Sequence, residues 1–240
     1  MVRDSREEWK TREGVFDKFT IGILQRLSGA GYFDELARVI SPGKEATVFA
    51  GTRGDGFAAI KIYRLETATF SKMYGYIRVD PRYDRLKNNQ RQVIFAWAER
   101  EHRNLLLCRS AGVRSPMPIA QRSNVLVMEF IGHGTQASPL LKHGRPEDPE
   151  AFAKLTLEEI EKLSAAGLAH GDLSEYNIIN HDEQPVLIDF SHSAPLHAPN
   201  STDLLIRDVE NVCRYFRGQG VELDTQKEID RMLKAAPKKG

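Results

Sequence analysis

The chain has 240 residues, and its 34 Lys and Arg nearly balance 33 Asp and Glu, giving a net charge of +1. This length supports one domain or two small lobes, and the overall charge balance alone gives no reason to expect a nucleic acid as a partner, so we expect no DNA. The two cysteines match neither a disulfide framework nor a metal-binding spacing. No signal peptide and no apolar stretch of about 18 residues are present, so we expect a cytoplasmic protein without a membrane partner.

The first 40 residues predict a helical extension. Apolar side chains recur at helical spacing in residues 14–40, and the spacing is broken at residues 29–31, which include two glycines. We therefore expect two short helices within residues 14–40, as part of an N-terminal helical extension over residues 1–40.

A strand hairpin and an insertion are expected next. Residues 47–51 and 57–63 are strand-like and are joined by the turn sequence T-R-G-D-G, which predicts a hairpin. Residues 64–90 are charged and aromatic without a clear period. We interpret them as a long, partly mobile insertion that lies outside the core.

Two helices and a strand are predicted further along the chain. Residues 89–112 predict a helix of about six turns that ends at a glycine. Residues 124–131 predict a buried strand. Asp148 as the cap, Pro149 in the first turn and Gly167 as the stop signal predict another helix.

The most informative run is H-G-D-L-S-E-Y-N-I-I-N-H-D-E-Q-P-V-L-I-D-F-S. In it Asp172 precedes Asn177 by five residues, and an apolar run ends twelve residues later at Asp189. A protein kinase catalytic loop has this spacing: the first Asp accepts or orients the proton of the attacking hydroxyl. The Asn and the second Asp hold Mg²⁺, which prefers oxygen ligands. The alternative is a polar turn before a buried strand.

The loop S-P-G-K-E-A-T-V is a candidate for phosphate binding. Aligned on the kinase pattern G-x-G-x-x-G-x-V, it keeps Gly43 and Val48, while Ser41 and Ala46 replace the outer glycines. Small residues let backbone N–H groups approach phosphate oxygens. Lys44 and Ser41 could add donors. An ordinary hairpin is the alternative interpretation.

Lys61 in A-A-I-K matches the kinase lysine that binds the α- and β-phosphates. The long helix offers Glu101 as its partner, because Glu101 lies near the middle of an apolar arc of roughly 100°, where an unpaired charge is costly. Glu99 points to the opposite side. The alternative is a Glu101 at the rim of the arc whose stem covers apolar surface. The apolar members of the arc are Ile94, Trp97, Ala98, Leu105 and Cys108.

The end of the strand N-V-L-V-M-E-F-I is where a hinge between two lobes would lie. Met128 would lie behind an adenine ring, and the backbone of Glu129 and Ile131 would hydrogen-bond its edge. Ala59 and Val48 would cover the ring from above. This assignment rests on position alone, because recognition by the backbone leaves little trace in side chains.

One histidine has an expected role. His170 is expected to support the catalytic loop rather than to act as a base. The others show no ligand spacing, so the sequence does not indicate a zinc site. They are His102, His133, His143, His181, His192 and His197.

Together these motifs resemble the RIO family of atypical protein kinases and ATPases, and its type-one subfamily in particular. The resemblance covers about residues 14–218 and rests on S-P-G-K-E-A, I-K-I-Y, W-A-E-R-E-H-R-N-L, H-G-D-L-S-E-Y-N, I-D-F-S-H-S and R-D-V-E-N-V. It differs at Pro42, where the subfamily usually has Thr. The type-two subfamily carries a winged-helix domain, for which the N-terminal extension is too short. The short tail after Gly220 leads us to expect a minimal, archaeal-like form.

The resemblance implies an α+β, two-lobed, protein-kinase-like fold. We expect a kinase N-lobe at residues 41–131, with a small antiparallel sheet, a long helix and the insertion at 64–90. A mainly helical C-lobe follows at residues 132–240. The glycines after Ile131 mark the boundary.

The resemblance also implies an activity and a partner. The family uses ATP and Mg²⁺, with Mn²⁺ as a possible substitute, as a serine/threonine protein kinase and an ATPase. Its turnover is linked to transient phosphorylation of the metal-binding Asp, here Asp189. The expected partner is the precursor of the small ribosomal subunit with its rRNA.

Departures from ordinary kinases lie around the catalytic run. Gly171 replaces the Arg that would bind an activation-loop phosphate, and Ser174 replaces the Lys that assists transfer. Only 11 residues separate Ser191 from Asp203, too few for a segment that positions a peptide.

Three other functions share parts of this pattern. Small-molecule phosphotransferases use H-G-D-L-x-x-x-N and I-D-F, but usually continue with G-D-P-x-x-D-L, which is absent here. Small tRNA-modification kinases have the compact second lobe, but the 27-residue insertion argues against them. The third is a binding module without chemistry, and the intact set of Lys61, Asp172, Asn177 and Asp189 argues against it.

A local excess of basic residues suggests an RNA-binding surface. Between Lys61 and Arg109 there are 11 Lys and Arg against 5 Asp and Glu. Basic residues displace counterions from phosphates, and aromatic rings stack on unpaired bases. The alternative is a solvated insertion that covers the nucleotide cleft. The aromatic residues among these charges are Tyr63, Phe70, Tyr74, Tyr76 and Tyr83.

Overall fold

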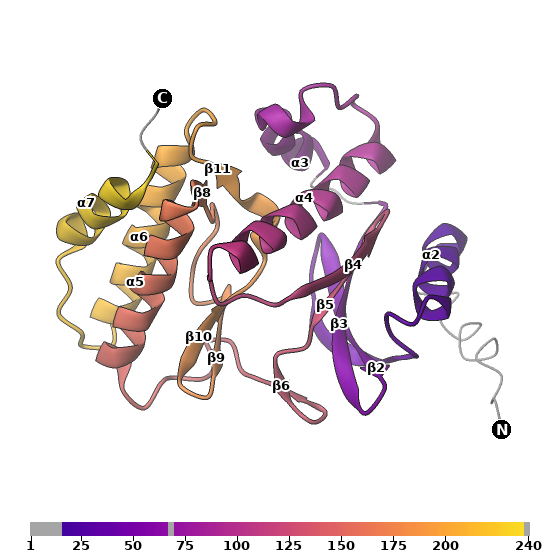
Figure 1. Ribbon diagram of the computed structural model, residues 1–240, viewed down its shortest axis with the longest axis horizontal. Helices are drawn as coiled ribbons and strands as arrows, with labels where there is room; N and C mark the ends of the chain where they lie inside the picture. Colours follow the sequence, from indigo (N-terminus) through magenta and orange to yellow (C-terminus); the bar gives the residue numbers. More distant parts are fainter. Residues whose placement is uncertain (1–15, 67–69, 238–240) are drawn as a thin grey trace.

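A five-stranded antiparallel sheet forms the N-terminal part of the protein in a computed structural model that describes residues 16–66 and 70–237. The strand order is β1-β2-β3-β5-β4. Figure 1 shows helix α4 crossing between this sheet and a group of helices at the C-terminal end. The strands are β1 (Leu36–Pro42), β2 (Ala46–Arg53), β3 (Gly56–Tyr63), β4 (Pro118–Arg122) and β5 (Val125–Glu129).

The predicted hairpin is confirmed. β2 and β3 pair antiparallel from Ala46↔Tyr63 to Arg53↔Gly56, which places Val48 opposite Lys61. β3 pairs in turn with β5. β3, the second strand of the hairpin, therefore lies in the middle of the sheet. Its side chains point alternately to the two faces and are buried on both.

The N-terminal extension contains one predicted helix and one strand. Helix α2 (Lys18–Gly29) begins where the Asp17 carboxylate accepts hydrogen bonds from the next backbone N–H groups, as expected for an N-cap. The second predicted helix is wrong, because residues 36–42 form β1, which pairs with β2. A segment this short shows little helical period, and β-branched Val39 and Ile40 favour an edge strand. Residues 1–15 of the predicted extension lie outside the described residues.

The described residues of the insertion, 64–66 and 70–90, are largely folded, and the expectation that they lie outside the core is wrong. They form α3 (Phe70–Ile77) and a turn of 3₁₀-helix, η1 (Pro81–Tyr83). Met73 and Ile77 are buried with Tyr83 against α4 (Gln90–Ser110) in a separate apolar cluster. α3 is short, and the charged residues around its few apolar positions make the helical period hard to recognise in the sequence.

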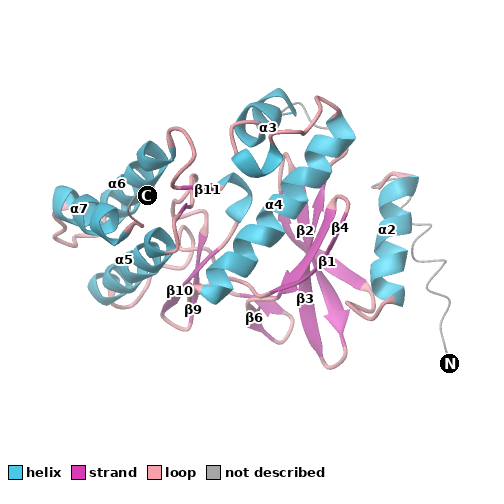
Figure 2. Cartoon of the chain, turned by 45° about the horizontal axis from the view of Figure 1, so that its top comes forward, coloured by secondary structure: helices cyan, strands magenta, loops and turns pink. Residues whose placement is uncertain are grey.

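The C-terminal part is mainly helical, as predicted. Its helices α5 (Pro149–Ala165), α6 (Ser201–Arg217) and α7 (Thr225–Ala235) enclose the largest apolar cluster. Figure 2 shows them on the side of α4 opposite the sheet. The Asp148 carboxylate caps α5, and Gly167 follows its end with φ +76°, as the sequence predicts for a start and a stop signal.

Short strands before α5 and between α5 and α6 complete the C-terminal part. They are β6 (Gly132–His133), β7 (Gln136–Ala137), β8 (Leu168–Ala169), β9 (Ile178–His181), β10 (Gln184–Leu187) and β11 (Ala194–Pro195), with the 3₁₀-helix η2 (Phe190–His192). Of these, β9 and β10 belong to the catalytic run. Throughout residues 16–66 and 70–237, helices long and apolar enough to cross a membrane are absent.

Candidate active site

Lys61 lies at the centre of a group of charges drawn from three elements. Its Nζ is 2.9 Å from Oε1 of Glu101 on α4 and 2.9 Å from Oδ1 of Asp189, which follows β10. The helical period of α4 predicted this partner, and Glu99 instead pairs with Arg103 at the surface. Glu101 is only 1% exposed, so its charge depends on these contacts.

The ion pairs fix the charges of this group. Burial alone would lower the pKa of Lys61, but the carboxylates of Asp189 and Glu101 raise it above its ordinary value. Burial would raise the pKa of Asp189, but Lys61 and the Ser191 hydroxyl hold it below its ordinary value. Tyr63 also donates its hydroxyl to Glu101. Lys61 is therefore a cation and Asp189 an anion at neutral pH.

The buried pair can be tested by a double-mutant cycle. We expect Lys61→Met and Glu101→Gln each to reduce ATPase activity. The double variant should lose less than the sum, with a coupling of about 0.5–3 kcal/mol, because the partners share one interaction. Glu99→Gln on the same helix is the matched control and should leave the rate near that of the unaltered protein. Additive losses, at equal thermal stability of the variants, would show that Glu101 does not act through Lys61.

Asp189 has an unusual backbone conformation. Its φ is +62° and its ψ +67°, in the left-handed region that few residues other than Gly occupy. The Ser191 hydroxyl donates to its Oδ1 at 2.7 Å. Such conformations persist where the surroundings hold them, and they concentrate at functional sites. Here the turn presents the carboxylate to Lys61.

Asp172 and Asn177 are joined within the catalytic loop. The Asn177 amide donates to the backbone oxygen of Asp172 at 2.7 Å and to its Oδ2 at 3.2 Å. The backbone N–H of Ile188 donates to the oxygen of Asn177 at 3.0 Å. That bond extends the β9–β10 ladder by one step, so Asn177 and Asp189 lie at the same end of this hairpin.

The donor atoms at this end fit a hard divalent cation. The amide nitrogen of Asn177 is engaged by Asp172, which leaves its oxygen Oδ1 as a ligand. Lys61 and Ser191 contact Oδ1 of Asp189, which leaves Oδ2. Carboxylate and amide oxygens are the ligands that Mg²⁺ prefers. Asn177 and Asp189 are therefore the residues that would hold it.

Asp208, for which the sequence predicted no role, holds the catalytic loop in place. Asp208 is 1% exposed, and it accepts the backbone N–H groups of Gly171 at 2.8 Å and of Leu173 at 3.0 Å. Asn211, one turn later on α6, donates to the Leu173 oxygen at 3.1 Å. The motif R-D-V-E-N-V could have indicated this role for Asp208, because a buried carboxylate on an apolar helix face needs hydrogen-bond donors.

Gly171 and His170 fit the same loop. Gly171 has φ +83°, and a Cβ there would lie 2.7 Å from the backbone oxygen of His192. The Arg that ordinary kinases have at this point cannot be accommodated. The buried His170 has its Nε2 2.9 Å from the Ile188 oxygen, and its ring packs on Phe190. These contacts suit a supporting role and leave the side chain of His170 away from solvent.

The small-residue loop closes the β1–β2 hairpin. Ser41 pairs with Val48 across the two strands, and both Ser41 and Lys44 are free of the core. A Cβ on Gly43 would lie 2.4 Å from the Ala46 oxygen, so only glycine fits this turn. The geometry leaves the loop able to approach a phosphate closely.

The proposed adenine site lies where β5 leaves the sheet. Ala59 is the cross-strand partner of Met128, and both belong to the large apolar cluster against which Val48 packs. The Ile131 N–H has no partner within the described part of the chain. The Glu129 N–H donates to the Met117 oxygen at 2.8 Å, so only the carbonyl of Glu129 could serve adenine.

A buried network joins the insertion to the segment after Asp189. The carboxylate of Asp80, 1% exposed, lies 2.7 Å from Arg82 Nη2 and 3.2 Å from Arg100 Nε. Arg100 donates to the Ser191 oxygen at 3.2 Å. Asn104 accepts from Arg82 at 2.9 Å and donates to the oxygens of two residues in or next to η2. Through Arg100 and Asn104, the insertion therefore helps to hold the turn that follows Asp189 in place.

Comparisons with known proteins show the family to which this chain belongs. A family model described as the RIO domain matches residues 47–229. The chain belongs to the RIO family. It is 40% identical over 219 residues to the RIO-type serine/threonine-protein kinase Rio1 of Haloferax volcanii, covering 91% of this chain and 76% of the relative. With Rio1 of Methanocaldococcus jannaschii the identity is 41% over 233 residues, covering 93% of this chain and 80% of the relative.

Solved RIO structures share the fold. The Rio2 kinase of Chaetomium thermophilum, as an ADP/Mg²⁺-phosphoaspartate complex, matches with a TM-score of 0.67 at 21% identity, over 90% of this chain and 66% of that one. Another structure of that kinase gives a TM-score of 0.69 at 20% identity, over 90% of this chain and 67% of that one. The two-lobed, kinase-like α+β fold is confirmed. The RIO protein described here is an enzyme, a kinase, and its relatives support ATP-dependent phosphoryl transfer.

Proposed function

We propose that this RIO protein transfers the γ-phosphoryl group of ATP to its own Asp189 and then to water or to a serine or threonine hydroxyl. The observation that carries the proposal is the position of Lys61, whose Nζ contacts both Glu101 and Asp189 at 2.9 Å. The ammonium group of Lys61 thereby links β3, the proposed phosphate-binding strand, to the carboxylate of Asp189. The phosphoaspartate in the Rio2 complex supports an acyl phosphate as the intermediate.

In the first step an oxygen of Asp189 forms a bond to the γ-phosphorus. The bond from that phosphorus to the β,γ-bridging oxygen breaks, and ADP leaves with the electron pair. In the second step a water or hydroxyl oxygen attacks the acyl phosphate, its proton passes to Asp172, and the carboxylate of Asp189 is regenerated. Mg²⁺, held by Asn177 and Asp189, would neutralise phosphate charge. Lys61 keeps Asp189 ionised and so available for attack.

The intermediate can be trapped directly. Incubation with ATP labelled at the γ-phosphate should label the protein at Asp189, and hydroxylamine should remove the label, since it cleaves acyl phosphates but not phosphoserine. Label that persists in hydroxylamine, with none at Asp189, would overturn the acyl-phosphate route and leave a direct kinase. The family match favours either route over a small-molecule phosphotransferase or a tRNA-modification kinase, two of the alternatives that share parts of the motif pattern.

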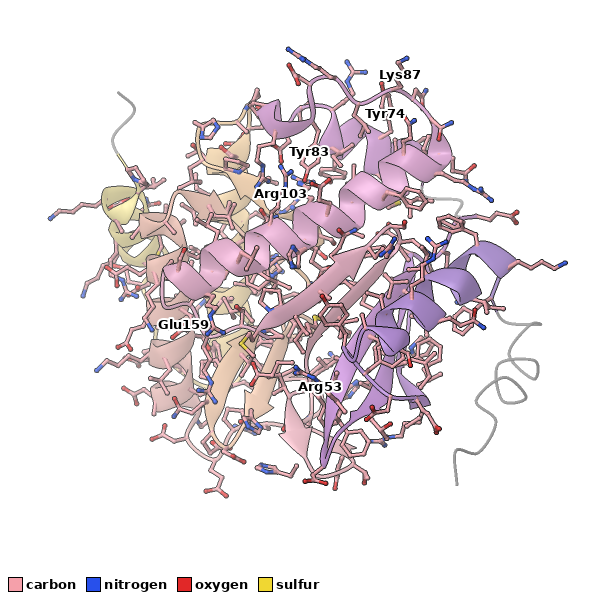
Figure 3. The ribbon with its side chains drawn as sticks, turned by 45° about the vertical axis from the view of Figure 1, so that its right-hand side comes forward. Arg53, Tyr74, Tyr83, Lys87, Arg103 and Glu159 are labelled. Carbon is pink, nitrogen blue, oxygen red and sulfur yellow. The ribbon has the colours of Figure 1, made fainter. Side chains whose placement is uncertain are left out.

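We further propose that the protein acts in maturation of the small ribosomal subunit, in the cytoplasm, and contacts rRNA through the insertion. The family resemblance supports the pathway, and the charge of the insertion supports the contact. Several basic side chains are exposed on it, and Figure 3 shows Lys87 on its outer edge. A hollow of about 590 Å³ opens beside them, lined among others by Arg85, Phe95 and Gln121. The other exposed basic residues of the insertion are Arg64, Lys72, Arg78 and Arg85.

Burial reduces the number of aromatic and basic side chains that could contact RNA. Tyr63 is 1% exposed and Tyr83 is 8% exposed, so neither can stack on a base as the sequence suggested. Figure 3 shows Tyr83 beside Arg103 on α4, where it packs rather than reaches outward. Tyr76, at 40% exposure, is the better candidate. Arg82 is held by Asp80 and Asn104, so its charge serves the fold.

Replacing exposed charges tests the RNA contact. We expect a variant with Ala at Lys72, Arg78, Arg85 and Lys87 to bind small ribosomal subunits more weakly and with a flatter salt dependence. The slope of log K against log salt should fall by up to about 0.7–0.9 for each phosphate that the variant no longer neutralises. ATP hydrolysis without subunits should stay near its original rate. Co-sedimentation across a salt series measures the affinity and its slope, and a steady-state assay measures the hydrolysis.

The matched control removes four exposed charges from the other end of the molecule. A variant with Ala at Lys154, Arg217, Lys227 and Lys234, which lie on α5, α6 and α7, should co-sediment as the unaltered protein does. Equal losses in both variants would indicate a general effect of charge. Unaltered binding by the insertion variant would exclude the insertion as the RNA contact.

A further inference from the structure

Two histidines and an aspartate from distant parts of the sequence meet on the surface below the hinge. His133 lies in β6, and His181 and Asp182 lie where β9 turns into β10. His133 Nε2 is 2.8 Å from Asp182 Oδ1, and His181 Nε2 is 3.8 Å from Asp182 Oδ2. One donor atom from each residue lies within 4.8 Å of the other two. Figures 1 and 2 both show β6 beside the β9–β10 hairpin.

The imidazole of His181 is oriented by a neighbouring side chain. Ser138 Oγ lies 2.8 Å from His181 Nδ1, at hydrogen-bonding distance. That contact occupies one ring nitrogen and turns the other, Nε2, toward Asp182. Histidines that bind metals are commonly oriented in this way by a hydrogen bond to the nitrogen that is not coordinated. Ser138 would therefore be a positioning residue for His181.

The arrangement is more specific than a surface ion pair. The rings of His133 and His181 are stacked, with centroids 5.0 Å apart and planes inclined by 27°. Each imidazole offers one nitrogen and the carboxylate offers one oxygen, so two nitrogens and one oxygen lie within 4.8 Å of one another.

We propose that His133, His181 and Asp182 bind a divalent transition-metal ion, Zn²⁺ in the first place. Two nitrogens and one oxygen suit Zn²⁺, with a water as the fourth ligand, whereas Mg²⁺ prefers oxygen alone. In a tetrahedral site with bonds near 2.0–2.1 Å the donors lie about 3.3 Å apart. His133 and Asp182 are 70% and 64% exposed, so both can make the small shifts required.

The ion would connect two neighbouring hairpins that both follow the proposed adenine site in the chain. His133 follows Ile131 by two residues, at the end of the proposed adenine site. β9 begins next to Asn177, and β10 leads to Asp189. A bound ion would cross-link the β6–β7 hairpin to the β9–β10 hairpin and add to the thermal stability of the protein, since it binds the folded state alone. The site is distinct from the Mg²⁺ position proposed above and does not depend on it.

The affinity can be measured by calorimetry on the untagged, chelator-treated protein with ZnCl₂, in excess MgCl₂ to fill the oxygen site. We expect one Zn²⁺ per chain. His133→Ala and His181→Ala should each weaken binding by at least about tenfold, and Ser138→Ala by about tenfold, within the range for residues that orient a ligand. His143→Ala is the matched control, since His143 is an exposed histidine at some distance along the chain, and it should bind as the unaltered protein does.

Cobalt gives a second readout that does not depend on heats. Co²⁺ at the site should show the visible absorption of a four-coordinate complex, and both His133→Ala and His181→Ala should lose it while their circular dichroism and melting temperature without metal stay unchanged. Binding of an adventitious ion only would appear as heats and spectra equal in all variants. That result, or the absence of saturable Zn²⁺ binding, would overturn the proposal.

Discussion

Asp189→Asn is expected to abolish most ATP turnover and to weaken the binding of ATP in the presence of Mg²⁺. The substitution removes a negative charge that Lys61 Nζ contacts at 2.9 Å, a metal ligand and the proposed nucleophile. Charge stabilisation by a metal is worth several kcal/mol, and each 1.36 kcal/mol is tenfold in rate, so a loss of roughly a hundredfold or more is expected. Steady-state ATPase assays and calorimetry with ATP and MgCl₂ measure the two effects, and the hydroxylamine-labile label should disappear.

Ser191→Ala tests how much of the effect comes from the hydrogen bond to Asp189 and how much from the carboxylate of Asp189 itself. It deletes the hydroxyl that donates to Asp189 at 2.7 Å and leaves the carboxylate itself in place. The expected loss is therefore smaller than for Asp189→Asn, and the acyl-phosphate label should persist. If Asp189→Asn instead keeps both the ATP affinity and the ATPase rate, Asp189 is neither the metal ligand nor the nucleophile.

Features of the site that follow from local periodicity could be predicted from the sequence. The turn between two strand-like runs predicted the hairpin with Lys61 in its second strand, and the structure pairs Lys61 with Val48. The period of a helix separates its faces, which distinguished the buried Glu101 from the exposed Glu99. The spacing from Asp172 to Asn177 fixes a short loop, and the structure joins those two side chains directly.

Features that depend on long-range packing could not be predicted. Residues 36–42 become a strand only because β2 offers an edge. Tyr83 looks like an exposed aromatic in a charged segment, yet α3 and α4 bury it. Asp208 shows its role only where the catalytic loop meets α6, and His133 lies 48 residues from His181 along the chain. In each case the deciding partner is distant in sequence, so neither spacing nor composition reveals it.

Asp172→Asn should reduce turnover without weakening the binding of ATP. The Asp172 side chain is exposed, and its contact with the Asn177 amide, at 3.2 Å, can be kept by an amide oxygen. The substitution removes the proton acceptor, which contributes about 10²–10⁴ in rate. Calorimetry should give an ATP affinity close to that of the unaltered protein, while kcat falls by that factor. Asp203→Asn, an exposed carboxylate in the first turn of α6, is the matched control.

The two steps of the proposed reaction give this variant a further signature. Attack by Asp189 on ATP needs no proton acceptor, because the carboxylate is already ionised. Attack of water on the acyl phosphate releases a proton, and that step is where Asp172 is proposed to act. In Asp172→Asn the label on Asp189 should therefore form and accumulate, while the release of phosphate slows. Label that fails to form, together with equal losses in affinity and rate, would assign Asp172 to the shape of the loop instead of to the chemistry.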